Sequence, residues 1–186
     1  MADTELRTQM DYVRSRMDIL DCVNRYARGQ DRLDSELTTS AFHPDAVLDF
    51  GVFVGDPAAF VDYFYDLHRR YHHSTSHIIC NHVCEIDGDR AYAETYFMVT
   101  NNNREGKPFH LGGGRYVDQF ERRAGRWAIA VRKCIAEWNA DSGGDLAEKL
   151  GSLHTDVGRI SRDRDDVSYE RPMTVPAERL GLRVPV

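Results

Sequence analysis

The chain has 186 residues, enough for a single domain with a substantial buried core. Its net charge of -6 argues against nucleic acid as the main partner, and its composition is ordinary for a globular protein. No run reaches the ~20 apolar residues of a membrane helix, and the acidic start at Asp3 and Glu5 is unlike an ordinary signal peptide. We therefore expect a cytoplasmic protein with neither nucleic acid nor membrane as a partner.

The first part of the sequence predicts three helices. An apolar stripe at helical spacing predicts the first, over residues 8–30, and its members are Ile19, Cys22, Val23 and Tyr26. A shorter second helix is expected over residues 32–42, with a turn at Pro44. Asp56 is a good N-cap, and the proline after it suits a first helical turn, which predicts a third helix over residues 57–71.

The strands follow these helices. Residues 46–54 (AVLDFGVFV) predict one strand, or two short ones around Gly51. Four further strands, joined by short turns that contain glycine, predict an antiparallel meander over residues 76–86, 90–100, 109–122 and 126–138. Helices followed by such a sheet indicate an α+β domain over residues 1–139.

A C-terminal extension over residues 140–186 differs in composition, with glycines, prolines and the charged run SRDRDD. It predicts a short helix over residues 145–153 and an extended tail. That tail would pack on the body or on a neighbouring subunit, and a partly mobile tail fits the same composition.

The four cysteines form no CxxC pair, and all lie in apolar segments. We expect them to be small buried hydrophobic residues in a reducing compartment: Cys22, Cys80, Cys84 and Cys134.

Two residues are of the types that form an acid–base pair. Asp31 follows the first helix, and His77 opens a strand-like run, SHIICN. A carboxylate that accepts a hydrogen bond from imidazole fixes its tautomer and raises its basicity. Asp31 also has the spacing of an N-cap for the second helix, and spacing alone leaves both roles open. The other histidines nearby favour no metal site, because no HExxH motif or cysteine ligand spacing accompanies them: His68, His72, His73 and His82.

Further candidates lie on the first helix and the last strand. Tyr26 is either a core aromatic residue or a donor to a substrate oxygen. Strict alternation places Arg132 among small residues, where a ligand would have room: Ala128, Ala130, Cys134 and Ala136. The alternative is an arginine on a solvated face, paired with Asp118 or Glu121. Residues that could line an apolar pocket are Phe50, Tyr92, Tyr96, His110 and Tyr116.

Three stretches together resemble the SnoaL-like branch of the NTF2-like superfamily. They are RYARGQDRLD, SHIICN and GGGRYVDQFERRAGRWAIAVRK, and the resemblance spans residues 10–138. It implies an NTF2-like cone, with three N-terminal helices packed on a strongly curved mixed or antiparallel sheet around a deep pocket. The family includes scytalone dehydratase, bile-acid 7α-dehydratase and hexachlorocyclohexane dehydrochlorinase, which are lyases with an Asp–His dyad and no cofactor.

The resemblance implies roles for four residues. Asp31 and His77 match the dyad, Tyr26 matches a tyrosine of the bile-acid enzyme, and Arg132 matches an arginine of the dehydrochlorinase. The dehydrochlorinase has lysine at the Tyr26 position, and the bile-acid enzyme lacks the arginine.

From these matches we expect a cofactor-independent dehydratase for a hydrophobic polycyclic, terpenoid or polyketide-like molecule. An isomerase or a cyclase could use the same dyad. A non-catalytic ligand-binding protein, similar to an oxygenase β subunit, would have the same fold. Family resemblance also suggests a homo-oligomer, either a dimer or a trimer.

Overall fold

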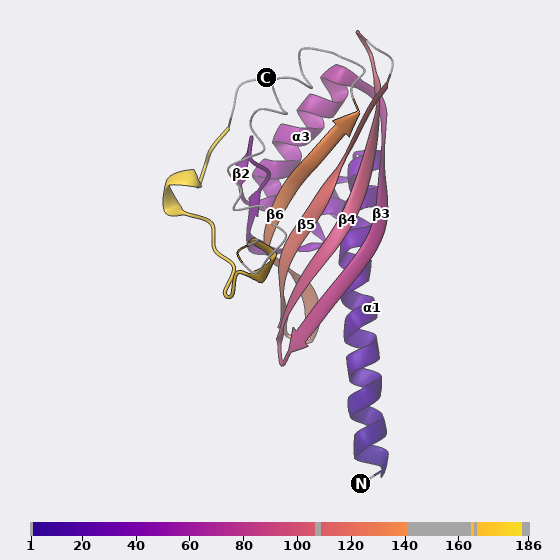
Figure 1. Cartoon of the computed structure of the whole chain (residues 1–186), viewed down its shortest axis with the longest axis vertical. Coiled ribbons are helices and arrows are strands. Elements are labelled where there is room, and N and C mark those ends of the chain that lie inside the picture. Colours follow the sequence, from indigo (N-terminus) through magenta and orange to yellow (C-terminus); the bar gives the residue numbers. More distant parts are fainter. Residues whose placement is uncertain (1, 107–108, 141–164, 166, 184–186) are drawn as a thin grey trace.

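The computed structural model describes residues 2–106, 109–140, 165 and 167–183 (Figure 1). Its elements are α1 (Ala2–Arg32), α2 (Ser35–Thr39), β1 (Phe42–Asp49), β2 (Val54–Gly55), α3 (Pro57–Tyr71), β3 (His72–Asp87), β4 (Arg90–Asn103), β5 (Phe109–Arg123), β6 (Arg126–Ala140), and the 3-10 helices η2 (Val167–Tyr169) and η3 (Ala177–Arg179). No helix in the described part of the chain is long and apolar enough to cross a membrane.

The six strands form one curved sheet in the order β2-β1-β6-β5-β4-β3. Strand β1 runs parallel to β6, and every other pair of neighbours is antiparallel, so the sheet is mixed. Three helices and this sheet make the expected α+β fold, and the expected meander corresponds to β3 to β6.

The sheet has an inner face, which packs against α1 and α3, and an outer face. The inner face carries the main core, which includes Ile19 and Val23 of α1, Phe60 of α3, and Phe120 and Ile129 of the sheet. The outer face carries a small cluster in which Val117 and Ile135 pack against residues of the C-terminal segment: Val167 and Met173.

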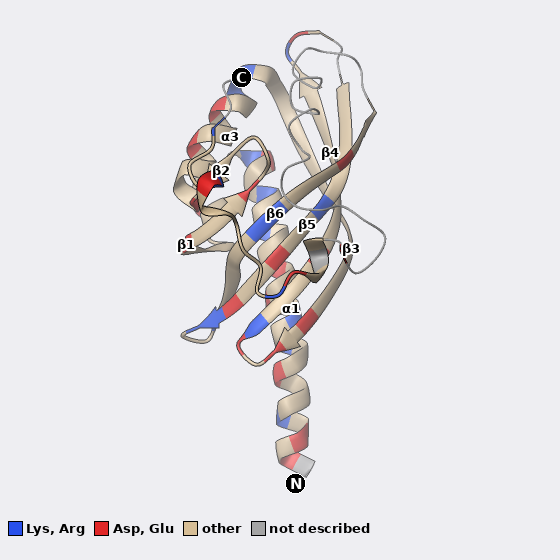
Figure 2. Cartoon of the chain, turned by 60° about the vertical axis from the view of Figure 1, so that its left-hand side comes forward, with Lys and Arg blue, Asp and Glu red and all other residues tan. Residues whose placement is uncertain are grey.

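The N-terminal part of α1 extends beyond the sheet in both views, and charged residues of both signs are interspersed along it (Figures 1 and 2). Helix α1 begins at Ala2, earlier than expected, and pairs four residues apart support its first turns, such as Arg7 with Asp3. An ion pair of 3.0 Å between Arg122 and Asp11 connects this part of α1 to the sheet.

Local signals place α3 correctly: Asp56 accepts a hydrogen bond of 2.9 Å from the Ala59 amide, and Pro57 starts the helix. The expectation of a turn at Pro44 is wrong. Pro44 lies within β1, where the pairing with β6 shifts register between Phe42 and Val47. A proline lacks the amide donor of a regular ladder and is tolerated at such an irregularity.

Helix α1 ends in a tight turn at Leu33, whose φ of 51° is left-handed, while the Asp34 amide donates to the Gly29 carbonyl over 2.9 Å. The second helix is shorter than expected because it starts only after this turn. A Cβ on Gly29 would lie 2.2 Å from Thr38 Oγ1, so only glycine lets α2 approach this closely. The Tyr65 hydroxyl donates to the same Gly29 carbonyl over 2.9 Å.

The described part of the C-terminal segment packs on the body. Its Leu182 carbonyl accepts from the Val54 amide over 2.8 Å, and Arg179 donates to both carboxylate oxygens of buried Asp49. Glu170 pairs with Lys133 of β6 on the outer face. The short helix expected over residues 145–153 lies outside the described residues.

Three of the four cysteines, Cys22, Cys84 and Cys134, are buried, and all four are free thiols. The expectation of burial is wrong for Cys80, which is exposed. Cys80 lies on the edge strand β3, where the register shifts between Ile79 and His82, so simple alternation does not hold there.

Candidate active site

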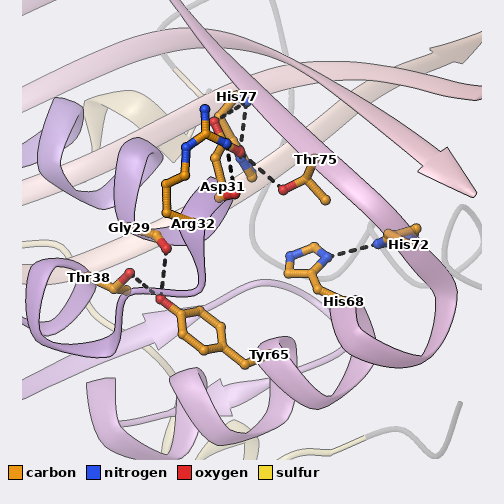
Figure 3. A network of polar contacts seen from close by, with 9 residues as sticks. All are labelled: Gly29, Asp31, Arg32, Thr38, Tyr65, His68, His72, Thr75 and His77. Carbon is orange, nitrogen blue, oxygen red and sulfur yellow. Dashed lines mark hydrogen bonds and ion pairs between the residues drawn. The ribbon is translucent and has the colours of Figure 1, made fainter.

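Asp31 and His77 form a hydrogen-bonded pair between the last turn of α1 and strand β3 (Figure 3). His77 Nδ1 lies 2.7 Å from Asp31 Oδ1, and the His77 amide donates to Asp31 Oδ2 over 2.9 Å. The Thr75 hydroxyl donates to Oδ1 over 3.1 Å. The side chains are only 14% and 9% exposed for Asp31 and His77, so the pair is largely shielded from solvent.

The alternative role for Asp31, as cap of the second helix, does not hold. Asp34 is the cap, because its side chain accepts from the Leu37 amide over 2.9 Å. Asp31 still lies within α1, and its carboxylate points to β3 instead.

Burial on its own would raise the pKa of Asp31, but hydrogen bonds and charge from His77, with a further bond from Thr75, outweigh burial and lower it. An ionised Asp31 accepts hydrogen bonds only, which keeps the His77 proton on Nδ1. His77 Nε2 then carries the lone pair, and it has no hydrogen-bond partner among the described residues. This is the arrangement of an imidazole base with a fixed tautomer.

Tyr26 lies beside the dyad on α1. Its ring centroid is 6.1 Å from that of His77 in an edge-to-face arrangement, and 5.4 Å from that of Tyr116. Burial raises the pKa of Tyr26, although the nearby Arg132 charge partly opposes this shift. The Tyr26 hydroxyl therefore stays protonated and can donate a hydrogen bond.

Arg132 of β6 is fully buried, and Asp118 of β5 binds it through two hydrogen bonds of 2.8 and 2.7 Å. Its guanidinium carbon lies 4.3 Å from the ring centre of Tyr26 and 4.2 Å from that of Tyr116, so the cation is stacked between two tyrosines. Burial opposes the charge of Arg132, but Asp118 outweighs burial and raises the pKa of Arg132. Nη1 of Arg132 is buried with no acceptor in the described part of the chain.

The expected surroundings of Arg132 are partly wrong. Its predicted partner Asp118 is correct, but both side chains are 0% exposed, so the face is not solvated. Asp118 pairs with Arg132 while Phe120 pairs with Ile129, so β6 has one extra residue at this point. The bulge turns Arg132 to the same face as Ile129, and Ala130 no longer shares its side.

The structure separates the expected pocket residues into two groups. Phe50 and Tyr116 are buried in the inner core. His110 lies on the same side of β5 as Tyr116, two residues from Gly112.

Placement of Tyr92 and Tyr96 in the pocket is wrong, because both lie on the outer face. Tyr92 has the Arg171 guanidinium 3.8 Å from its ring centre, and Tyr96 is 43% exposed. Alternation along β4 instead turns Ala91, Ala93 and Phe97 inward.

Sequence reasoning missed Thr75, the second side chain that bonds Asp31, and it weighed His68 and His72 only as metal ligands. Nδ1 of His68 lies 2.9 Å from Nδ1 of His72. Among the described residues, no three side chains of the types that bind metals converge on one point. The i, i+4 spacing of these two histidines was the available signal for a contact between them.

The fold and this site define a class: a helix-covered, curved mixed sheet that holds a carboxylate–imidazole pair on its inner face. The model of the SnoaL-like domain family matches residues 11–133, and the chain belongs to that family. No curated protein matches the chain.

Among solved structures, the chain is similar to hexachlorocyclohexane dehydrochlorinase LinA-type3 from Novosphingobium barchaimii, with 21% identity and a TM-score of 0.67 over 73% of this chain and 95% of that one. A putative scytalone dehydratase from Novosphingobium aromaticivorans has 17% identity and a TM-score of 0.60, over 77% of this chain and 93% of that one. A protein of unknown function with a cystatin-like fold from Nostoc punctiforme has 21% identity and a TM-score of 0.54, over 70% of this chain and 94% of that one. At these identities the likeness shows the fold.

Proposed function

We propose that the protein is a cofactor-independent lyase of the dehydratase type, in which His77 removes a proton from a carbon next to a carbonyl. One observation carries this proposal: His77 Nδ1 is tied to Asp31 over 2.7 Å, and the opposite ring nitrogen has no partner among the described residues. A neutral imidazole held in this way is a base suited to neutral pH.

The second requirement is a group that stabilises the negative charge on the carbonyl oxygen. Tyr26 supplies a protonated hydroxyl beside His77, and Arg132 supplies a buried positive charge stacked on the Tyr26 ring. Because Arg132 is paired with Asp118 and stacks on the Tyr26 ring, it acts through Tyr26, whose hydroxyl donates to the enolate oxygen in the proposed reaction. In the proposed reaction the C–H proton moves to His77 Nε2, a carbon–carbon double bond forms, and the leaving group departs from the next carbon.

The surroundings favour an apolar substrate. Aromatic side chains surround Tyr26 beside the dyad: Phe50 and Phe60 contact the Tyr26 ring, and Phe97 stacks on Tyr116. Aromatic surroundings of this kind bind apolar rings, while a few polar groups set orientation. We therefore propose a polycyclic, terpenoid or polyketide-like ketone as the substrate class.

The test uses two ketone probes. Benzylacetone reports deprotonation, because its α-hydrogens exchange with deuterium in heavy water, followed by NMR. The β-hydroxyketone formed from benzaldehyde and acetone reports elimination, because it loses water to give benzalacetone, followed by absorbance. Conversion of a β,γ-unsaturated ketone, which has no leaving group, into its conjugated isomer would instead indicate an isomerase.

Replacing His77→Ala or Asp31→Asn should lower both rates by about 10²- to 10⁴-fold. The matched control is His73→Ala, which changes an exposed histidine of the same strand and should leave both rates unchanged. Retention of the full rates by both dyad variants would refute the proposal. Failure of the wild-type protein to exchange α-hydrogens in any ketone, from benzylacetone to a tetracyclic steroid, would also refute it.

A further inference from the structure

A second imidazole pair lies close to the dyad. His68 is in the last turn of α3, His72 is the first residue of β3, and their Nδ1 atoms are 2.9 Å apart. A hydrogen bond between two Nδ1 atoms has room for one proton, so one ring donates while the other accepts. If both rings were protonated, no acceptor would remain, and the contact requires at least one neutral ring.

Burial keeps both rings neutral. It lowers the pKa of His68 to about 3, with further lowering from His72 and His77 and an opposing effect of Asp31. Burial likewise lowers the pKa of His72 to about 4, with His110 and Arg104 acting in the same direction. Near neutral pH the pair is therefore a neutral hydrogen-bonded unit.

The pair and the stacked arginine lie at opposite ends of the dyad. In Figure 1, α1 runs upward from the N-terminus and β3 runs downward. Tyr26 precedes Asp31 along α1, and His72 precedes His77 along β3. Because α1 and β3 run in opposite directions, Tyr26 and His72 lie on opposite sides of the dyad. Figure 3 shows the His68 ring between His72 and the dyad. His68 Nε2, on the ring edge away from His72, has no partner among the described residues.

The charges around the pair favour one tautomer. The cation of Arg104 is within electrostatic range of His72, and the anion of Asp31 is within range of His68. A positive charge at one end and a negative charge at the other favour N–H bonds that all point toward the negative end. His72 Nδ1–H then donates to His68 Nδ1, and His68 carries its proton on Nε2.

We propose that His68 contacts the substrate and donates its Nε2–H to the departing oxygen, with His72 as the positioning residue that holds this tautomer. The proposal rests on the proposed lyase function. In the step, the C–O bond breaks while His68 holds that oxygen. His68 keeps its proton and stays neutral throughout. The proton that His77 took from carbon passes to the oxygen, water leaves, and His77 returns to its neutral form.

The first test needs no substrate. NMR of protein labelled with ¹⁵N-histidine distinguishes the two neutral tautomers, and the His68 signals are assigned as those lost in His68→Gln. The expected result near pH 7 is a neutral His68 with its proton on Nε2 and an acceptor nitrogen at Nδ1. A His68 that carries its proton on Nδ1, or that is charged, would overturn the proposal whether or not any ketone reacts.

The second test separates the departing oxygen from proton removal. In His68→Phe, elimination from the β-hydroxyketone probe should fall by about 10²-fold, the usual effect of removing one such donor. Deuterium exchange into benzylacetone, which has no leaving group, should stay within about threefold of wild type. His68→Gln keeps an amide N–H near the Nε2 position, so it should restore part of the elimination rate. The control Val83→Phe, at an exposed position of the same strand, should change neither rate.

An equal fall of exchange and elimination in His68→Phe would show a merely structural role, and no loss of elimination would show no role. The lyase proposal fails by a different result, namely exchange that persists in His77→Ala. The two proposals therefore fail separately.

Discussion

The buried pair of Arg132 and Asp118 gives a prediction whose size follows from the structure. Both side chains are 0% exposed, and two hydrogen bonds of 2.8 and 2.7 Å join them. Asp118→Asn removes the negative charge and leaves a buried cation uncompensated, which should lower the free energy of unfolding by about 3–5 kcal/mol. Arg132→Met leaves the buried Asp118 carboxylate without its partner and should lower the free energy of unfolding by a similar amount.

The double variant Arg132→Met with Asp118→Leu should recover most of this loss, because it removes both charges and fills similar volume. Urea unfolding followed by tryptophan fluorescence measures all four chains, and a coupling of several kcal/mol is expected between the two sites. The surface pair Arg123 and Asp45, with side chains 42% and 67% exposed, is the control and should give about 1 kcal/mol or less. Additive losses in the double variant would show that the pair does not behave as a buried unit.

Three further predictions concern stability and reactivity. The folded pKa values of His68 and His72, about 3 and about 4, lie below the ordinary 6.5, so the unfolded chain binds more protons in acid. The free energy of unfolding should thus fall as pH drops from 6.5 toward 4, by up to about 1.4 kcal/mol per pH unit for each histidine, as urea titrations at stepped pH would measure. Gly29→Ala should destabilise by about 1–3 kcal/mol despite the better helix propensity of alanine, because the new Cβ would meet Thr38 at 2.2 Å. Cys80 alone should react with a thiol reagent in the folded protein, and mass spectrometry would count one modified cysteine before unfolding and four after it.

Each of these has a clear contrary outcome. A flat stability profile between pH 6.5 and 4 would mean that the histidine pair accepts protons in the fold. A stabilised Gly29→Ala variant would mean that α2 can move away from α1. Labelling of the buried thiols at the rate of Cys80 would contradict their burial, which raises the pKa of Cys22 and Cys84 to about 11.

Local signals in the sequence were sufficient to predict several helices and strands. Asp56 followed by proline determined the start of α3, and the short glycine turns determined the hairpins of the meander. The contact between Asp31 and His77 was also expected, but through family resemblance, since spacing alone left Asp31 as a cap or an orienting carboxylate. Only the contact of 2.7 Å, together with Asp34 in the cap position, separated these two roles.

Tertiary structure decided what depends on pairing between distant segments. The bulge in β6 changed the face of Arg132, and the pairing of β4 with β3 and β5 sent Tyr92 and Tyr96 outward. A one-residue shift in register moves every side chain of a strand to the opposite face of the sheet. The sequence of a strand shows which residues alternate, but it does not show where a neighbouring strand introduces such a shift. The contact of His68 with His72 likewise depends on the abrupt passage from α3 into β3. Helix caps and turns are short-range interactions that a sequence determines by itself, whereas the side of a sheet on which a residue lies is a property of the assembled neighbours.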